Sequence, residues 1–178
     1  MILAATTASG AAVDTFSKRD ARVLTAALAD FDANAESREF NPPGIIAVVS
    51  ETQPLPSHLA TARDINGLPD LHPSAPPDSV ADYLRRNRVG VLLRLDPHAP
   101  PSLQLERPKG TRCAPSISRS PGVRTCVYPQ APGYSASGDW AFVTFQYLWS
   151  IHSGVAVYLL RRETGNWAVA AKFYQVYL

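Results

Sequence analysis

Apolar and polar positions alternate most regularly in the last quarter of the chain, from Gly133 to Leu178. Val, Phe, Tyr, Trp and Thr dominate this stretch, and residues of these types favour a pleated, half-buried surface. The alternation predicts three consecutive antiparallel strands, Trp140–Trp149, Val155–Arg161 and Trp167–Tyr177. A loop at 150–154 should join the first two strands. A hairpin loop at 162–166 should join the last two, with Gly165 at positive φ.

The third of these strands has two partly apolar faces. Strict alternation places four side chains on each face: Trp167, Val169, Ala171 and Phe173 against Ala168, Ala170, Lys172 and Tyr174. One face should therefore pack on a helix. The other should meet a loop, a partner or solvent.

A helical period begins at Ser17, which can cap a helix whose capping-box partner is Asp20. An apolar stripe follows at helical spacing: Val23, Leu24, Ala27, Leu28 and Phe31. The pattern predicts a helix that ends near Asn34 and buries this stripe against the C-terminal strands.

The middle of the chain predicts shorter elements separated by proline-rich loops. Ile45–Ser50 is a continuous apolar run typical of a buried strand, and Val89–Leu95 predicts another, with Ser102–Glu106 a further candidate. A second helix should be capped by Asp78 or Ser79 and end in 85–88, where arginines suit the helix dipole.

These elements predict an α+β fold in which an N-terminal helix packs on an antiparallel sheet that ends in a three-stranded meander. Residues 1–13 form a small-residue tail, and residues 14–178 form a single domain with proline-rich loops at 51–77 and 96–133. A hydrophobic share of 46% with 18% charged residues is typical of a globular chain.

Charge is unevenly distributed along the chain although the formal net charge is only +2. Residues 1–84 hold 5 basic and 11 acidic side chains, whereas residues 85–124 hold 9 basic and 2 acidic ones. A basic middle could bind nucleic acid, or the two halves could neutralise each other in the folded chain. Because no nucleic-acid motif accompanies the charge, we do not expect a nucleic-acid partner.

Two cysteines, Cys113 and Cys126, flank a loop rich in Pro, Ser and Arg. We predict that they form a disulfide in an oxidising compartment; the alternative is two reduced thiols in the cytosol. Residues 1–13 look like the tail that remains after a secretory signal is cleaved. We therefore expect a periplasmic or secreted protein, and the absence of a long apolar run predicts no membrane span.

No catalytic, cofactor-binding or metal-binding motif is present, and we predict neither cofactor nor metal. His58 and His72 share a loop with carboxylates, and His98 lies in a predicted surface turn. His152 lies beside Ser150 and Ser153, but a catalytic serine also needs a positioned carboxylate and oxyanion donors. Histidines in surface loops often have no functional role. The four histidines therefore do not indicate an enzyme.

The aromatic residues of the C-terminal block allow two interpretations. Tyrosine and tryptophan at a surface anchor protein partners, whereas buried rings form a core in which each polar atom finds a hydrogen bond. On the first interpretation the partner-binding residues are Tyr134, Tyr147, Trp149, Tyr158 and Tyr174, with Arg112 and Arg119 of the basic loop.

Four short motifs in the C-terminal block carry a resemblance to known proteins: 133–135, 138–143, 158–162 and 165–169. They resemble the ending of uncharacterised exported bacterial proteins that finish in a β-meander with a G-x-W-x-V last strand. They are similar, less closely, to the final strands of the nuclear-transport-factor-2-like (SnoaL-like) superfamily. The first resemblance implies no known activity, and the second implies a cone-shaped fold with a small-molecule pocket.

The sequence thus predicts a non-enzymatic, exported binding protein, such as an inhibitor or immunity-type protein that acts on a bacterial protein partner. The alternative is a pocket protein or enzyme of the nuclear-transport-factor-2-like kind. A closed apolar pocket lined by Trp140, Tyr147 or Tyr174 would favour the alternative. An exposed aromatic face would favour the binding protein. The sequence leaves the oligomeric state open.

Overall fold

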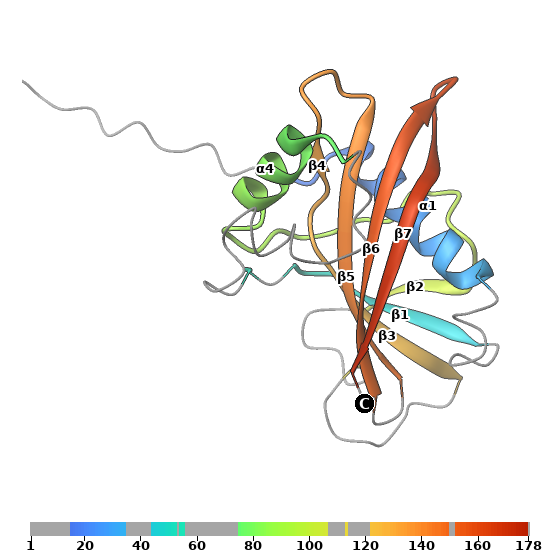
Figure 1. Ribbon diagram of the computed structural model, residues 1–178. Coiled ribbons are helices and arrows are strands. Elements are labelled where there is room, and N and C mark those ends of the chain that lie inside the picture. Colours follow the sequence, from blue (N-terminus) through green and yellow to red (C-terminus); the bar gives the residue numbers. More distant parts are fainter. Residues whose placement is uncertain are drawn as a thin grey trace, which may run out of the picture.

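Figure 1 shows the computed structural model, in which two helices and a seven-stranded sheet are described. The description covers residues 15–34, 44–52, 54–55, 75–106, 113, 122–149 and 152–177. The elements in chain order are α1 (Lys18–Ala33), β1 (Ile45–Val49), α4 (Pro77–Arg86), β2 (Leu103–Glu106), β3 (Val123–Pro129), β4 (Gly133–Tyr134), β5 (Trp140–Trp149), β6 (His152–Glu163) and β7 (Asn166–Tyr177). The predicted α+β class is confirmed.

The sheet is mostly antiparallel, and its strands follow the order β2-β1-β3-β5-β6-β7, with β4 beside β5. β5, β6 and β7 form the predicted meander. β1 runs parallel to both β2 and β3, which the sequence did not predict. β3 lies inside the region predicted as the loop 96–133. Its arginine and proline obscured a short strand whose centre, Thr125 to Val127, is buried.

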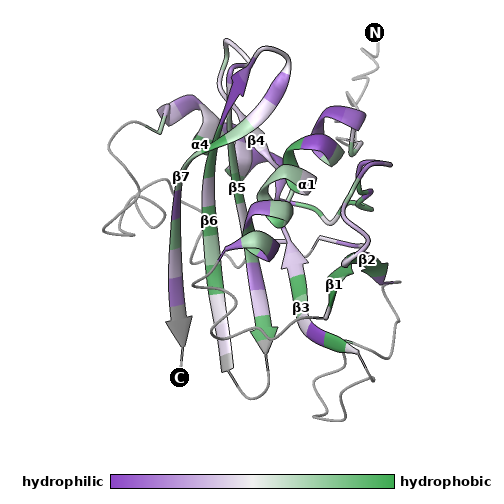
Figure 2. Ribbon diagram, turned by 90° about the vertical axis from the view of Figure 1, so that its right-hand side faces the viewer, coloured by the Kyte–Doolittle hydropathy of each residue, from purple (hydrophilic) through white to green (hydrophobic). Residues whose placement is uncertain are grey.

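α1 forms where the sequence predicts it and packs on one face of the meander, opposite α4 (Figures 1 and 2). The capping box closes its first turn: Ser17 N donates to the Asp20 carboxylate at 2.6 Å, and Asp20 N donates to Ser17 Oγ at 3.2 Å. The predicted apolar stripe is buried in the main core. At its end, Phe31 contacts the rings of Phe145 and Tyr147, with centroids 5.2 and 5.1 Å away.

A bulge in β7 changes which side chains share a face. Leu159 pairs with Ala171 but Leu160 pairs with Val169, so β7 holds one extra residue at Ala170. Trp167 and Val169 therefore share the α1 face with Tyr174, and Phe173 packs on the opposite side with the α4 cluster. The predicted strict alternation along β7 is wrong beyond Val169, because alternation alone does not reveal an inserted residue.

The β6–β7 hairpin is tighter than the sequence predicts. Only Thr164 and Gly165 lie between the two strands, at φ 45° and 90°. Two consecutive left-handed residues make the turn that matches the twist of paired strands, which confirms positive φ at Gly165. At the other end, β6 begins at His152, so the predicted loop 150–154 is shorter than expected.

α4 covers the opposite face of the sheet through Tyr83, whose ring meets Phe142 edge-on at 5.1 Å and whose hydroxyl lies 2.6 Å from Thr144 Oγ1. The helix begins at Pro77 with Pro76 as its N-cap, so neither predicted cap is correct. Proline suits the first helical position because its fixed φ is already helical. The backbone of α4 approaches Gly133 so closely that a β-carbon there would clash with Ser79 O and Tyr83 N.

The predicted strand Val89–Leu95 is wrong. This segment makes one isolated bridge, between Leu92 and Glu51, and scattered bonds to Ser50 and Thr52. Val91 and Leu93 are buried while Val89 and Leu92 are exposed, so the segment lies extended at the edge of the core. Its apolar residues are thus explained by burial of one side of the segment, which is not one of the strands of the described sheet.

The predicted disulfide between Cys113 and Cys126 is confirmed, with the two Cα atoms 5.6 Å apart. Cys126 belongs to β3, where it pairs with Ala47 of β1 and Leu148 of β5. Tyr128 adds a second link, since its hydroxyl donates to Cys113 O at 2.8 Å. The bridge therefore holds Cys113 against the middle of the sheet. A disulfide is consistent with an extracellular or secreted protein.

Replacing both Cys113 and Cys126 with Ser should lower the free energy of unfolding by about 3 kcal/mol, because the bridge restricts the unfolded chain over 13 residues. Urea denaturation measures the change. The oxidised wild type in the same buffer is the reference, and the reduced wild type should match the double variant. Equal midpoints for all three samples would show that the bridge does not stabilise the fold.

Candidate binding surface

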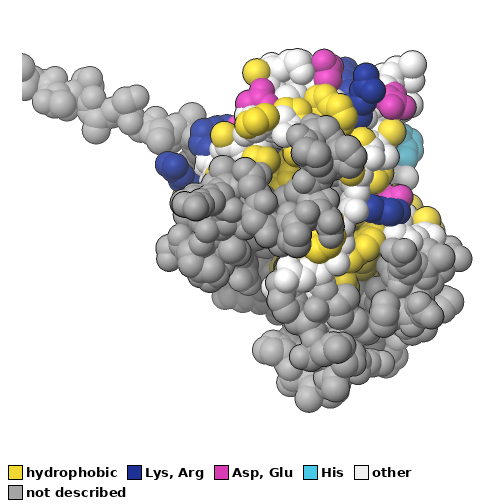
Figure 3. Space-filling model, viewed as in Figure 1, with side chains coloured by type: hydrophobic (Ala, Val, Ile, Leu, Met, Phe, Trp, Pro, Cys, Tyr) yellow, Lys and Arg dark blue, Asp and Glu magenta, His cyan; other side chains and the backbone are white. Residues whose placement is uncertain are grey.

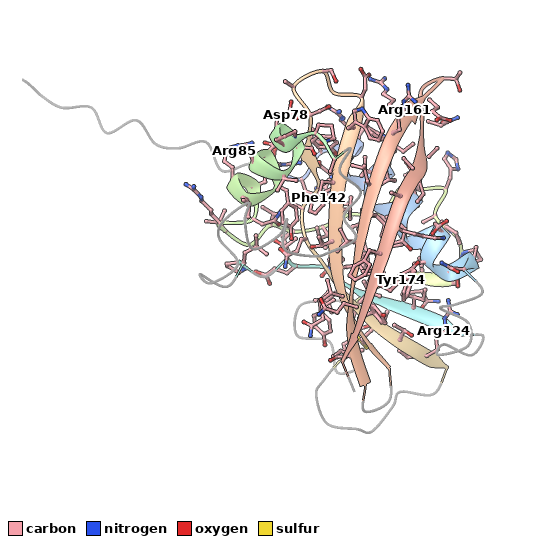
Figure 4. All side chains as sticks on the ribbon, viewed as in Figure 1. Asp78, Arg85, Arg124, Phe142, Arg161 and Tyr174 are labelled. Atoms are coloured by element: carbon pink, nitrogen blue, oxygen red, sulfur yellow. A yellow bond between two sulfur atoms is a disulfide. The ribbon has the colours of Figure 1, made fainter. Side chains whose placement is uncertain are left out.

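Two tyrosines of the meander are tied to α1 by a shared hydrogen-bond network. Tyr158 is fully buried, and its hydroxyl donates to Asp30 at 3.2 Å and lies 2.5 Å from the Tyr174 hydroxyl. Asn34 donates to Tyr174 at 3.0 Å, and Lys172 binds Asp30 at 2.9 Å. Figure 4 shows Tyr174 in this region of β7. These rings stabilise the contact between helix and sheet.

Burial raises the pKa of these tyrosines. For Tyr158 the cause is burial first, followed by the nearby Tyr174 and Asp30. For Tyr147 burial and the neighbouring Tyr174 raise the pKa to about 12. Tyr147, Tyr158 and Tyr174 are therefore neutral at physiological pH. A neutral tyrosine hydroxyl donates a hydrogen bond and does not act as a base. The network is therefore suited to holding structure.

In the native chain, the absorbance at 295 nm should show Tyr147 ionising near pH 12, while in urea it should ionise near the ordinary pKa of about 10. The raised pKa means that the folded state favours the neutral form. Its contribution to stability is therefore full below pH 10 and is lost as pH rises from 10 towards 12. Subtracting the titration of Tyr147→Phe identifies the group. A Tyr147 transition near pH 10 with circular dichroism still native would contradict this burial.

A buried ion pair joins the start of α1 to the end of α4. Arg86 donates to both oxygens of Asp20, at 2.6 and 3.0 Å, and also to Pro132 O. The Tyr134 hydroxyl donates to the same carboxylate at 2.8 Å. Burial by itself would raise the pKa of Asp20, but the hydrogen bond and charge of Arg86 and the bonds from Ser17 hold it below 3.8. The charged pair therefore persists at neutral pH and is lost only in acid.

Beside this pair, arginine and aromatic side chains gather at the end of the sheet that carries the β6–β7 hairpin. We define the aromatic–arginine end as Arg19, Tyr134, Trp140, Arg161 and Trp167. The Arg19 guanidinium lies 3.8 Å from the Tyr134 ring centre and 5.4 Å from that of Trp167, and Arg161 lies 5.6 Å from Trp140. Both tryptophans are half-buried and Arg161 is exposed. Figure 4 labels Arg161 at this end of the sheet.

The strands fix the positions of these side chains. Trp140 of β5 pairs directly with Arg161 of β6, and Trp167 of β7 pairs with Arg162. Arg19 of α1 donates to Gly138 O at 2.6 Å, which holds its guanidinium over the rings. Stacked cations of this kind contribute about 0.5–2 kcal/mol each, depending on how far they are removed from water. Tyr134 and Trp167 lie on the α1 face with Arg19, whereas Trp140 and Arg161 lie on the α4 face, so this end of the sheet presents ordered side chains on both faces.

Acidic residues are interspersed with the arginines at this end. Asp139 and Glu163 are exposed next to Trp140 and the hairpin turn. Figure 3 shows acidic, basic and hydrophobic side chains side by side at the top of the molecule. Mixed charge around half-buried aromatic rings is typical of protein–protein interfaces.

The structure distributes the predicted binding residues over several places. Tyr147, Tyr158 and Tyr174 lie in the helix–sheet contact, which corresponds to the core interpretation. Among the predicted residues whose side chains the structure describes, Tyr134 alone reaches the aromatic–arginine end. Trp149 ends β5, but its side chain is not described. Arg112, Arg119, His58 and His72 and the tail 1–13 lie outside the described residues, and the His152 side chain is also not described.

Sequence reasoning did not assign Arg19, Arg161 and Trp167 to a site, and it considered Trp140 only as a residue that could line a small-molecule pocket. The pairing of Trp140 with Arg161 could have been found from the hairpin registers, but the boundaries of the strands were too uncertain to fix them. Arg19 gave no signal, since its partner Gly138 is 119 positions away in the chain.

The described residues hold no cluster of three or more His, Cys, Asp or Glu that could bind a metal. Within those same ranges, no helix is both long and apolar enough to cross a membrane. No family model matches the chain, and comparisons with curated proteins and with solved structures found no significant match.

Proposed function

We propose that this is a non-enzymatic, exported protein, periplasmic or secreted, that binds a protein partner through the aromatic–arginine end. An inhibitor or immunity-type protein fits this description. The observation that carries the proposal is the pair of half-buried tryptophans, each beside an arginine cation: Trp140 beside Arg161 of the paired strand β6, and Trp167 beside Arg19 of α1. Trp, Tyr and Arg are the residues that supply most of the binding energy in protein interfaces.

Rigidity supports this choice of surface. The rings at the aromatic–arginine end are held before any partner arrives, so binding orders few side chains. A side chain that must be immobilised on binding costs about 0.5–1.5 kcal/mol, and that cost is avoided here. The same argument does not extend to the tyrosines of the network, because Tyr158 is fully buried.

The packing of α1 argues against a small-molecule pocket between helix and sheet. Such a pocket would be lined by Tyr147 and Tyr174, but Phe31 fills the space between them, with ring centres 5.1 and 6.0 Å away. Trp140, the third residue expected in a pocket, lies at the far end of β5. These contacts favour a binding surface over an internal ligand.

Photo-crosslinking in the native host tests the proposal. A benzophenone amino acid placed at Trp140 should capture one recurrent protein, identified by mass spectrometry. The matched control carries it at Gln146, which is exposed on the same face of the same strand. An Arg161→Ala change should reduce the adduct at least about tenfold, a loss of about 1.4 kcal/mol. Equal adducts from both positions, or none from Trp140, would contradict the proposal.

A further inference from the structure

β7 forms an open edge of the sheet. It is 12 residues long, lies last in the strand order and, among the described residues, pairs only with β6 (Figures 1 and 2). Its outer side therefore presents a row of backbone N–H and C=O groups that another extended chain can bind. Only a strand matches such a row, so the chemistry of the edge defines the kind of partner.

The two edge strands of the sheet differ in how well they are protected from pairing with another chain. β2, at the opposite edge, has only 4 residues and ends in the charged Glu106. β7 is three times as long, contains no proline and has one charged side chain, Lys172. Short strands, prolines and charges are the usual means of preventing edge-to-edge pairing. β7 uses one other such device, the bulge at Ala170, which disturbs its first half and leaves Ala171–Tyr177 regular.

The charge at this edge permits pairing between identical copies. Lys172 is bound by Asp30 of α1 at 2.9 Å, so the edge is close to neutral. A register centred on Tyr174 places Lys172 opposite residue 176 of the second copy and Phe173 opposite Gln175. In that register no charged residue faces its own copy, which removes the main electrostatic cost of symmetric pairing.

We propose that the chain forms a symmetric dimer in which Ala171–Tyr177 of β7 pairs antiparallel with the same segment of a second copy. The two sheets then join into one continuous sheet across a two-fold axis, because an antiparallel strand pair is self-complementary. This surface is separate from the proposed partner contact at Trp140 and Arg161, so a dimer presents two copies of the aromatic–arginine end. The proposed dimer does not depend on the proposed function, and either can be wrong without the other.

Sedimentation equilibrium of the full oxidised chain over a range of concentrations tests the dimer. The wild type should show a reversible monomer–dimer equilibrium. Gln175→Lys places two new cations on one face of the paired edge, diagonal to each other across the two-fold axis, and should raise the dissociation constant at least about tenfold. Gln146→Lys is the matched control, because Gln146 and Gln175 both pair with Val155 and lie in one row on one face, with Gln146 in the middle of the sheet.

A monomeric wild type at every concentration would overturn the proposal, as would a dimer unaffected by Gln175→Lys or weakened equally by Gln146→Lys. If Gln175→Lys does not fold, hydrogen exchange of the wild type decides the matter. Amides in 171–177 should exchange at least about tenfold more slowly at high than at low protein concentration, while those of β2 should not change. Exchange in 171–177 that does not depend on concentration would exclude pairing at this edge.

Discussion

Replacing Leu28 with Asp should leave the chain largely unfolded at 25 °C. Leu28 is fully buried in the core between α1 and the meander. Shortening such a side chain costs about 2–5 kcal/mol, and an unpaired carboxylate in the same place adds several more. The sum approaches the whole stability of a typical domain, about 5–15 kcal/mol. Far-ultraviolet circular dichroism and urea denaturation measure the loss.

Ala33→Asp is the control for this change. Ala33 is exposed in the last turn of α1, so the same new charge should cost less than about 1 kcal/mol there. A folded Leu28→Asp variant with a urea midpoint close to that of Ala33→Asp would show that the face of α1 carrying Leu28 is not buried.

Arg86→Met should lower the free energy of unfolding by about 3–5 kcal/mol at pH 7, because it leaves the Asp20 carboxylate buried without its cation. The effect should shrink as pH falls below 3.8. The lowered pKa of Asp20 means that the pair stabilises the fold above the ordinary pKa and ceases to do so as the carboxylate becomes protonated. Urea denaturation at pH 7 and pH 3 measures both values.

Arg85→Met provides the comparison one position away. Arg85 also binds a carboxylate, Asp82, at 2.8 Å, but its side chain is 57% exposed. Pairs in contact with water contribute at most about 1 kcal/mol. Similar losses for the two variants at pH 7, or a loss for Arg86→Met that is the same at pH 3, would contradict a buried, charged Asp20.

The elements that the sequence predicted correctly are those whose signal is local. The capping box at Ser17 and the stripe ending in Phe31 define α1 without reference to any other segment. Gly165 marks its turn for the same reason, because only the local backbone conformation matters there. The long alternating run from Trp140 predicts β5 to its last residue.

What the sequence missed depends on contacts between distant segments. β3 reads as a loop because Arg124 and Pro129 interrupt its apolar pattern, yet β1 and β5 on either side supply its hydrogen bonds. The reverse holds for Val89–Leu95, whose apolar pattern is that of a strand but which has no continuous strand partner among the described residues. Pairing, which a single sequence does not display, decided both cases.

The division between core and surface aromatics was equally hidden. Tyr158 and Trp167 look alike in the pattern, since both occupy alternating positions of long strands. Tyr158 is fully buried, and its hydroxyl meets Asp30 of α1 and Tyr174, whereas Trp167 is only half-buried against the same core and meets Arg19 at the start of α1. The candidate surface therefore became visible only when α1 was placed on the sheet.

Nuclear Overhauser effects between aromatic rings test the central claim, that α1 is packed on the meander by Phe31. The chain with labelled aromatic side chains should show cross-peaks from the Phe31 ring to those of Phe145 and Tyr147, whose centres lie 5.2 and 5.1 Å away. Phe31→Leu should remove these cross-peaks and identify them. A folded chain in which Phe31 shows no contact with either ring would contradict the account.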